Sequence, residues 1–310
     1  MAKVNNSVYF TGLLVLEGLT LVGLFLIFRT QSHPFTGGAA ELLGSHDPSQ
    51  RVRGDLIPPP DILAKDITYN ASFFQSNDLK SYLAAFPIAF ARRLTQLGAK
   101  GRLLDAGAGE ALFAEQLVSL EKDPSPELTF NDEREDLFRQ LLERPLIERP
   151  VVVAVDVEIK RKDIPRHDGH LEILSGRLFE EIPMGILATF DVIVDNQGVL
   201  AFSSSPVDQT LGRYLAILRE DGAIFVSLGS EDSNYAAASR VRTPDRGSIS
   251  LLDWLYSIEG LSIQMGSVDK DHRALMISKV SRTVTLPRLK LESMKPRGSE
   301  APVRFYVQER

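Results

Sequence analysis

The chain has 310 residues, of which 44% are hydrophobic and 25% are charged, and its formal net charge is −6. These values predict a globular protein with one large domain and an appendage, or with two small domains. The absence of cysteine excludes disulfides, thiolate metal sites and cysteine nucleophiles. Because phosphate binding requires clustered positive charge, the acidic balance argues against nucleic acid as the main partner. A local basic patch remains compatible with the sequence, either at Arg161 and Lys162 or at Arg240 and Arg242.

Residues 8–28 form an apolar run in which Glu17 is the only charged residue. The run has about the 20 residues that a membrane-spanning helix needs. Positive charge is greater after the run than before it, which favours a cytoplasmic location for the C-terminal side. We therefore predict that residues 1–29 are a single-pass membrane anchor and that the rest of the chain lies in the cytoplasm. A cleaved signal peptide and a helix packed within a soluble protein are the alternatives.

Composition divides the remainder of the chain. Residues 30–60 are rich in Pro, Gly, Ser and His and end in three prolines, which predicts an extended linker. Residues 61–282 carry the patterns of a folded domain. Within it, residues 121–150 separate two expected strands by more than usual, and we interpret them as an inserted helix. Residues 283–310 are polar and contain proline, so we expect an extension with no role in the core.

Helices and strands alternate within the folded domain. Residues 79–97 have the apolar spacing of a helix that breaks or kinks at Pro87. Further helices are expected at residues 207–218 and 248–258. Apolar runs predict strands, which are residues 102–105, 150–156, 171–175, 190–195, 223–227, 261–265 and 274–279. The alternation is typical of an α/β protein with a mostly parallel sheet.

The sequence RLLDAGAGEA at residues 102–111 is the most informative motif of the chain. It predicts a strand that carries Asp105, a tight turn with Gly107 and Gly109, and the start of a helix. Glycine lets a ligand approach the main chain closely, and a helix start leaves unpaired N–H groups near that ligand. A dinucleotide-binding fingerprint requires a third glycine where Leu112 stands. The order apolar-apolar-Asp-x-Gly-x-Gly instead resembles the first motif of class I S-adenosylmethionine-dependent methyltransferases.

The resemblance extends over residues 79–279. It implies a doubly wound, mostly parallel sheet of seven strands with helices on both faces, a closing antiparallel hairpin, and S-adenosylmethionine as the cofactor. Asp105, Gly107 and Gly109 would bind the cofactor. Asp156, which ends an apolar strand, resembles the family's acid that accepts hydrogen bonds from the ribose hydroxyls.

The third and fourth segments of the family pattern add further candidates. Arg177 stands where an acid that contacts the adenine is expected, which is a departure from the pattern, and either backbone groups would contact the adenine edge or Leu178 and Phe179 would line the adenine pocket. The fourth segment, FDVIVDN, ends at Asp195 and Asn196. In the family this strand end lies beside the transferred methyl group. The resemblance therefore implies that Asp195 contacts the cofactor and that Asp195 and Asn196 orient or deprotonate the acceptor.

Three functions remain open at this stage. The first is S-adenosylmethionine-dependent methyl transfer to a small-molecule or lipid-like acceptor, which fits a membrane tether. The second is a binding or scaffold protein that has the fold without catalysis, which Arg177 and Asp221 motivate because both depart from the family pattern. The third is an NAD(P)-dependent oxidoreductase. We expect no metal site, because the closely spaced pair His167 and His170 lies in a polar loop.

Overall fold

The structure is a computed structural model that describes residues 78–309 apart from gaps at 120–128, 157, 160, 162–163, 166, 204, 230–235, 268–272 and 298–299. The predicted anchor and linker lie outside the described residues, as does the beginning of the predicted domain. Among the helices that the structure describes, none combines the length and the apolar content needed to cross a bilayer.

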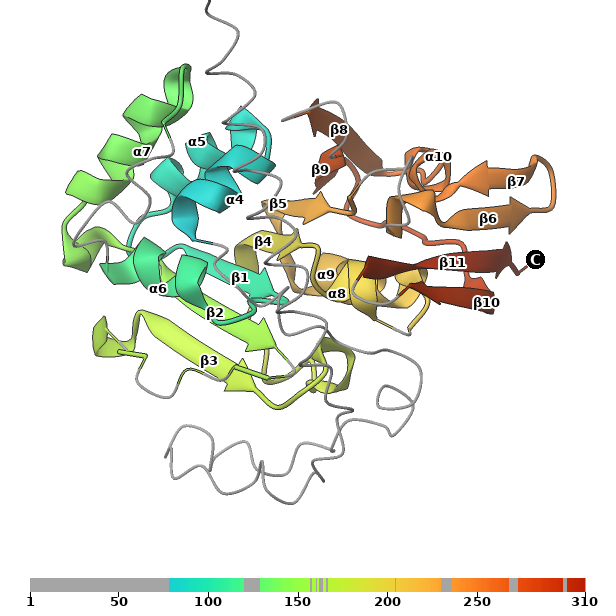
Figure 1. Ribbon diagram of the computed structural model, residues 1–310, viewed down its shortest axis with the longest axis horizontal. Coiled ribbons are helices and arrows are strands. Elements are labelled where there is room, and N and C mark those ends of the chain that lie inside the picture. Colours follow the sequence, from blue (N-terminus) through green and yellow to red (C-terminus); the bar gives the residue numbers. More distant parts are fainter. Residues whose placement is uncertain are drawn as a thin grey trace, which may run out of the picture.

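A central sheet of seven strands organises the molecule (Figure 1). Its order is β3-β2-β1-β4-β5-β9-β8. The first five strands are parallel, and β9 runs antiparallel to both β5 and β8. This arrangement confirms the predicted mostly parallel sheet with a closing hairpin. The strands are β1 (Arg102–Ala106), β2 (Val151–Asp156), β3 (Leu171–Ser175), β4 (Phe190–Asn196), β5 (Leu218–Ser227), β8 (Leu261–Ser267) and β9 (Arg273–Lys279).

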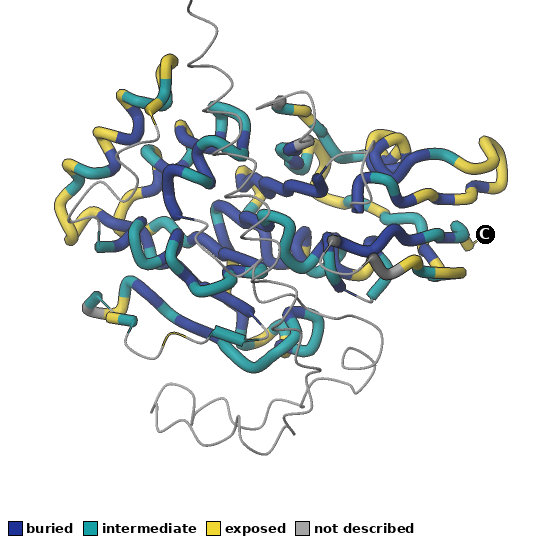
Figure 2. Tube along the Cα trace, in the orientation of Figure 1, coloured by how far each residue is buried: buried dark blue, intermediate teal, exposed yellow. Residues whose placement is uncertain are grey.

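Helices cover both faces of this sheet. One apolar core lies beneath α4 (Leu79–Ala85), α5 (Ile88–Gln96), α6 (Leu112–Ser119) and α7 (Glu133–Glu143). The core on the other face includes α8 (Val199–Phe202), α9 (Val207–Ile217) and α10 (Leu251–Tyr256). Successive residues of a strand serve opposite cores, as Leu103 and Leu104 do. The central strands are therefore buried on both sides (Figure 2), which explains their continuous apolar sequences.

The helical segments agree with the predicted break and the predicted helix. Pro87 separates α4 from α5, because proline lacks an N–H and its ring obstructs the preceding turn. The Asp78 carboxylate caps α4 by accepting a hydrogen bond of 2.7 Å from the N–H of Ser81. Residues 121–150 contain the helix α7, which Asp132 caps in the same way through the N–H of Arg134; that this helix is an insertion stays a prediction.

A second sheet was not predicted. It has the order β10-β11-β6-β7 and consists of β6 (Arg240–Thr243), β7 (Gly247–Ser250), β10 (Leu289–Arg297) and β11 (Glu300–Gln308). The helix expected at residues 248–258 is shorter, because β7 takes its beginning and α10 starts at Leu251.

The expectation that residues 283–310 have no role in the core is wrong. Ala301, Arg304 and Tyr306 are each at most 1% exposed. The segment is polar on average because β10 is mostly exposed, whereas β11, which lies between β10 and β6, is mostly buried. Buried and exposed residues alternate in β6, where Arg240 and Arg242 are exposed and Val241 is buried.

Candidate functional site

Two loops meet at the carboxyl edge of the parallel strands, where ligands bind in open α/β sheets. One follows β1 and contains Gly107, and the other follows β4 and contains Gly198. A Cβ atom at Gly107 would lie 2.4 Å from the Cα of Gly198, and a Cβ at Gly198 would lie 2.4 Å from the carbonyl oxygen of Ala106. Only glycine fits at either position, so the two loops pack main chain against main chain.

Both loops contain left-handed backbone. The φ angles are +77° at Gly107 and +57° at Gly109, and two residues with side chains share this conformation, Ala111 at +57° and Gln197 at +53°. Left-handed backbone is uncommon for residues other than glycine, and such strain concentrates at binding and catalytic sites. The strain occurs on both sides of the contact between the loops, which marks this edge as the candidate site.

The loop after β1, which we call the glycine loop, forms hydrogen bonds with the end of β2. The N–H groups of Gly107 and Ala108 donate to the carbonyl oxygen of Val155 over 2.9 and 3.0 Å. The N–H of Gly109 donates to Oδ2 of Asp156 over 2.8 Å, and the N–H of Glu158 donates to Oδ1 over 3.2 Å. Three consecutive N–H groups of the loop are therefore engaged within the protein, two by a carbonyl and one by a carboxylate.

Asp105 is fully buried beneath this loop. The Tyr82 hydroxyl of α4 donates to Oδ1 over 3.0 Å, whereas Oδ2 has no hydrogen-bond partner within the described part of the chain. Burial raises the pKa of Asp105 to about 8; the Tyr82 hydrogen bond opposes this shift, and the negative charges of Asp156 and Asp195 add to it. The carboxyl group therefore holds a proton at neutral pH, and one of its oxygen atoms is unpaired.

Asp195 has a different environment on the other face of the sheet. Its Oδ1 accepts from the N–H of Gly198 over 2.8 Å. Its Oδ2 accepts from the N–H of Leu200 over 2.7 Å and from the Tyr214 hydroxyl of α9 over 2.8 Å. Burial raises the pKa of Asp195 to about 6, and these three hydrogen bonds oppose the shift. The fully buried carboxylate thus holds the loop after β4, which favours a positioning role over the expected proton-accepting role.

The remaining predicted residues lie in two places. Asn196 is half-buried beside the loop after β4, and its side chain forms no hydrogen bond with the residues that the structure describes. Leu178 is also half-buried and precedes a short 3₁₀ turn, η5 (Phe179–Glu181). It follows β3, which β2 separates from β1. The structure therefore brings Asp105, Gly107, Gly109 and Asp156 together, and it places Leu178 two strands away from β1.

Three further residues of this region were not predicted from the sequence. Tyr82 and Tyr214 lie in amphipathic helices, where they resemble ordinary core residues, although a buried tyrosine hydroxyl usually needs a partner. Arg304 of β11 is 1% exposed. Its guanidinium donates to the carbonyl oxygens of Leu200, over 2.8 Å, and Ala201 in α8. The C-terminal sheet thus supports the helix that follows the β4 loop, and no local pattern in the sequence indicates this contact.

Other candidate sites are weaker. Within the described residues, no group of three or more His, Asp or Glu side chains has the arrangement of a metal site.

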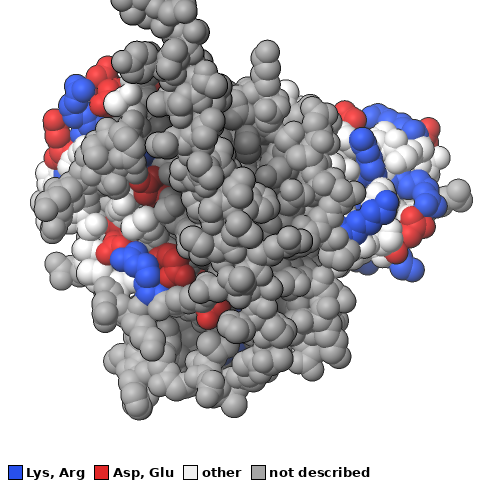
Figure 3. Space-filling model, viewed as in Figure 1, with Lys and Arg blue, Asp and Glu red and all other residues white. Residues whose placement is uncertain are grey.

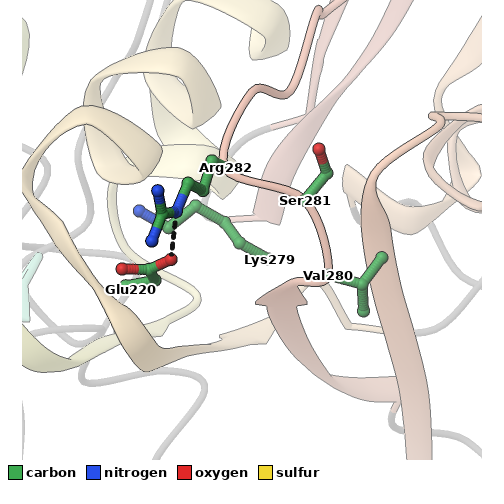
Figure 4. A pocket seen from close by; sticks show the side chains of 5 residues that line it. All are labelled: Glu220, Lys279, Val280, Ser281 and Arg282. Carbon is green, nitrogen blue, oxygen red and sulfur yellow. Dashed lines mark hydrogen bonds and ion pairs between the residues drawn. The ribbon is translucent and has the colours of Figure 1, made fainter.

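A cavity of about 350 Å³ lies near the start of β5 and the end of β9 and is lined by Glu220, Lys279, Val280, Ser281 and Arg282 (Figure 4). The Lys279 ammonium donates to the Leu218 carbonyl over 2.7 Å, and Arg282 donates to Glu220 over 2.9 Å. Both cations are paired within the protein, and the cavity lies away from the strained loops.

No family model and no curated protein matches the chain. Among solved structures, an rRNA methylase from Streptococcus thermophilus is similar, with 12% identity over 63% of this chain and 97% of that one and a TM-score of 0.36. The 1,6-didemethyltoxoflavin-N1-methyltransferase of Burkholderia thailandensis, with bound S-adenosylhomocysteine, has 17% identity over 66% and 80% of the two chains and a TM-score of 0.37. A glycopeptide N-methyltransferase complexed with sinefungin has 13% identity over 67% and 89% and a TM-score of 0.39. With TM-scores below 0.5, these similarities do not establish a shared function.

Proposed function

We propose that the chain is an S-adenosylmethionine-dependent methyltransferase whose cofactor site lies at the carboxyl edge of β1 and β2. One observation carries the proposal. The region around the glycine loop is acidic and its main-chain donors are engaged, so it suits a cationic ligand. Asp105 and Asp156 supply the carboxylates, and one oxygen of the fully buried Asp105 is unpaired.

S-adenosylmethionine fits these groups by its charge. It carries a positive sulfonium and a positive α-ammonium, and an unpaired buried carboxyl oxygen gains a partner from either cation. A dinucleotide carries an anionic pyrophosphate, which such folds bind through free N–H groups at a glycine loop. In this chain the N–H groups of Gly107, Ala108 and Gly109 already donate to Val155 and Asp156. The same contacts therefore argue against an NAD(P)-dependent oxidoreductase.

Each residue has a role in this proposal. Asp105 pairs with a cationic group of the cofactor. Asp156, which ends β2 and accepts from the N–H of Gly109, binds the ribose hydroxyls. Gly107 and Gly109 permit close approach to the main chain. Leu178 contacts the adenine.

The loop after β4 would serve the acceptor. When bound, the cofactor supplies a methyl group on a sulfonium, which is a good electrophile, so the protein mainly aligns the acceptor. The half-buried amide of Asn196 orients the acceptor. Asp195 and Tyr214 keep that loop in place through their hydrogen bond. A small-molecule or lipid-like acceptor, like the membrane anchor at residues 1–29, stays a prediction from the sequence.

The scaffold function is the second candidate, and one observation favours it. The direct contact between Gly107 and Gly198 leaves no room for even a methyl group between the two loops. A protein that lost its cofactor could retain such closed loops. This alternative predicts a folded chain that does not bind S-adenosylmethionine.

Calorimetric titration of the full chain with S-adenosylmethionine, S-adenosylhomocysteine and NAD⁺ distinguishes the three functions. We expect micromolar binding of the first two ligands and none of NAD⁺. Gly107→Ala should abolish binding, because the new Cβ meets the main chain of Gly198. Gly185→Ala is the matched control, since a Cβ there has no atom within 4 Å. Failure of the folded protein to bind S-adenosylmethionine would refute the proposal and favour the scaffold, and binding of NAD⁺ alone would favour the oxidoreductase.

A further inference from the structure

The second sheet has an outer face that lies largely outside the core, although Val303 and Ser250, which pair with Lys295 and Arg240 on that face, are buried. In a sheet, residues paired across neighbouring strands point to the same side. Phe305 of β11 pairs with Arg240 of β6, and Val307 pairs with both Arg242 of β6 and Lys290 of β10. Lys295 of β10 joins this face, with its ammonium 5.1 Å from the Phe305 ring centroid. We call these residues the basic sheet face: Arg240, Arg242, Lys290, Lys295, Phe305 and Val307.

The opposite face of the same strands is occupied. Val241, Leu289 and Tyr306 belong to the apolar core on the α8–α10 side of the central sheet. The residues on this opposite face therefore attach the second sheet to the rest of the molecule. The residues of the basic sheet face are not needed for that attachment, so their composition requires another explanation.

Positive charge is concentrated on this face although the whole chain has a net charge of −6. All four of its cations are exposed, and Figure 3 shows Lys and Arg side chains gathered on the part of the surface where Figure 1 places the second sheet. Among the described residues, Glu292 forms an ion pair of 2.7 Å with Arg242, in which both side chains are about half exposed. Exposed ion pairs contribute about 0–1 kcal/mol, so a stronger anion can displace Glu292.

The cations form two rows with an aromatic side chain between them. Arg240 and Arg242 lie on β6, Lys290 and Lys295 lie on β10, and the half-buried Phe305 lies on β11 between these strands. Neighbouring strands are about 4.8 Å apart, so the two rows are separated by about 10 Å. Within β6 the two arginines are about 6.6 Å apart, because side chains on one face repeat every second residue. An aromatic ring flanked by cations is the combination that single-stranded nucleic acids require, with phosphates on the cations and a base on the ring.

We propose that the basic sheet face binds single-stranded nucleic acid. The phosphates would contact the two rows of cations and a base would stack near Phe305, where the Lys295 ammonium now lies. An aromatic residue that binds a bilayer projects into it, whereas Phe305 is half-buried and has the Lys295 ammonium over its ring. A duplex keeps its bases stacked inside, so it also does not use the ring. The acidic net charge argued against this partner, but the charge is distributed unevenly over the molecule. The inference does not depend on the proposed methyl transfer.

Fluorescence anisotropy of the full chain with a labelled oligouridylate of about 12 nucleotides tests this surface. Four phosphate contacts predict that log K falls with log[salt] with a slope of about −3 between about 50 and 200 mM salt. The double variant Arg240→Gln/Arg242→Gln should reduce that slope by about 1.4 and weaken binding at least tenfold. The control Arg139→Gln/Arg282→Gln removes two exposed arginines elsewhere, on α7 and after β9, and should leave binding unchanged.

Phe305 separates base stacking from simple charge attraction. Phe305→Leu should weaken binding at least fivefold with an unchanged salt slope, and Phe305→Tyr, which keeps the ring, should restore it. Equal thermal melting temperatures of these two variants would show that the difference is not a folding defect. The proposal is overturned if the oligonucleotide does not bind, if the control variant loses as much affinity as the β6 variant, or if Phe305→Leu binds normally. Binding to phosphatidylglycerol vesicles that depends on the arginines while oligouridylate binding is absent would assign the face to a bilayer.

Discussion

The unpaired oxygen of Asp105 predicts that cofactor binding depends on pH. Burial raises the pKa of this carboxyl to about 8, so the ligand-free protein holds a proton there at neutral pH. A cationic cofactor pairs with the carboxylate, and binding must therefore release that proton. S-adenosylmethionine should bind more tightly as the pH rises, and replacement of Asp105 by asparagine should remove this dependence.

The size of this pH effect follows from the fraction of the protein in which Asp105 is ionised. With a pKa of about 8, about 1% of the carboxyl is ionised at pH 6, about 9% at pH 7 and about 50% at pH 8. The apparent dissociation constant equals the intrinsic constant divided by this fraction. It should therefore fall about tenfold between pH 6 and pH 7, and about fivefold more between pH 7 and pH 8.

Calorimetric titration at these three pH values, in two buffers of different ionisation enthalpy, measures both the affinity and the number of protons released. Asp105→Asn controls for ionisation of the ligand's own α-amino group, which titrates near pH 8. A wild-type affinity that is equal at pH 6 and pH 8, or an affinity of Asp105→Asn that rises with pH as steeply as in the wild type, would refute the reasoning.

The same variant predicts a change in stability whose sign can be stated. The unfolded chain loses the Asp105 proton near pH 3.8, whereas the folded protein keeps it to about pH 8. The wild-type protein should therefore lose stability as the pH rises between these values, because the unfolded state binds fewer protons. Asparagine does not titrate, so the melting temperature of Asp105→Asn should rise relative to that of the wild type between pH 5 and pH 8. A difference in melting temperature that is the same at all pH values would contradict the raised pKa of Asp105.

Three further predictions concern the loops and their supports. Gly107→Ala should lower the free energy of unfolding by about 1–3 kcal/mol in urea titration, from the left-handed backbone and the close contact with Gly198, while Gly185→Ala changes it little. Tyr214→Phe should cost about 1 kcal/mol, because Oδ2 of Asp195 then keeps only its main-chain donor; an unchanged unfolding midpoint would show that this hydrogen bond contributes nothing. Arg304→Met should cost about 3 kcal/mol and speed amide exchange in α8, since two buried carbonyl groups lose their donor; exchange as slow as in the wild type would contradict the support described here.

The central sheet was predictable because its signals are local. The run PVVVAVD ends in a carboxylate and is buried on both faces, and the break at Pro87 follows from the chemistry of one residue. The second sheet was not predictable in this way. Its strands have one buried face and pair over long sequence distances, as β6 and β11 do. Average polarity over residues 283–310 conceals the difference between the mostly exposed β10 and the mostly buried β11.

The candidate site was also predictable from the sequence only in part. The sequence indicates that Asp105, Asp156 and Asp195 stand at strand ends, and the structure places them there. The sequence does not indicate which hydrogen-bond donors reach each carboxyl group. Tyr82 comes from a helix that precedes Asp105 by 23 residues, and Tyr214 follows Asp195 by 19 residues. These contacts leave one oxygen of Asp105 unpaired and both oxygens of Asp195 engaged, and so give the two residues different roles.

The contact of Arg304 with α8 has a consequence for the order of folding. Arg304 follows its acceptor Leu200 by 104 residues, so the ribosome completes α8 long before it makes the residue that supports it. By then the nascent chain already contains the partners of the glycine loop and of Asp195, because these come from β2 and α9. A chain that ends before Arg304 would therefore keep the hydrogen-bond donors of both strand-end carboxyl groups, and two carbonyl groups of α8 would lack this donor.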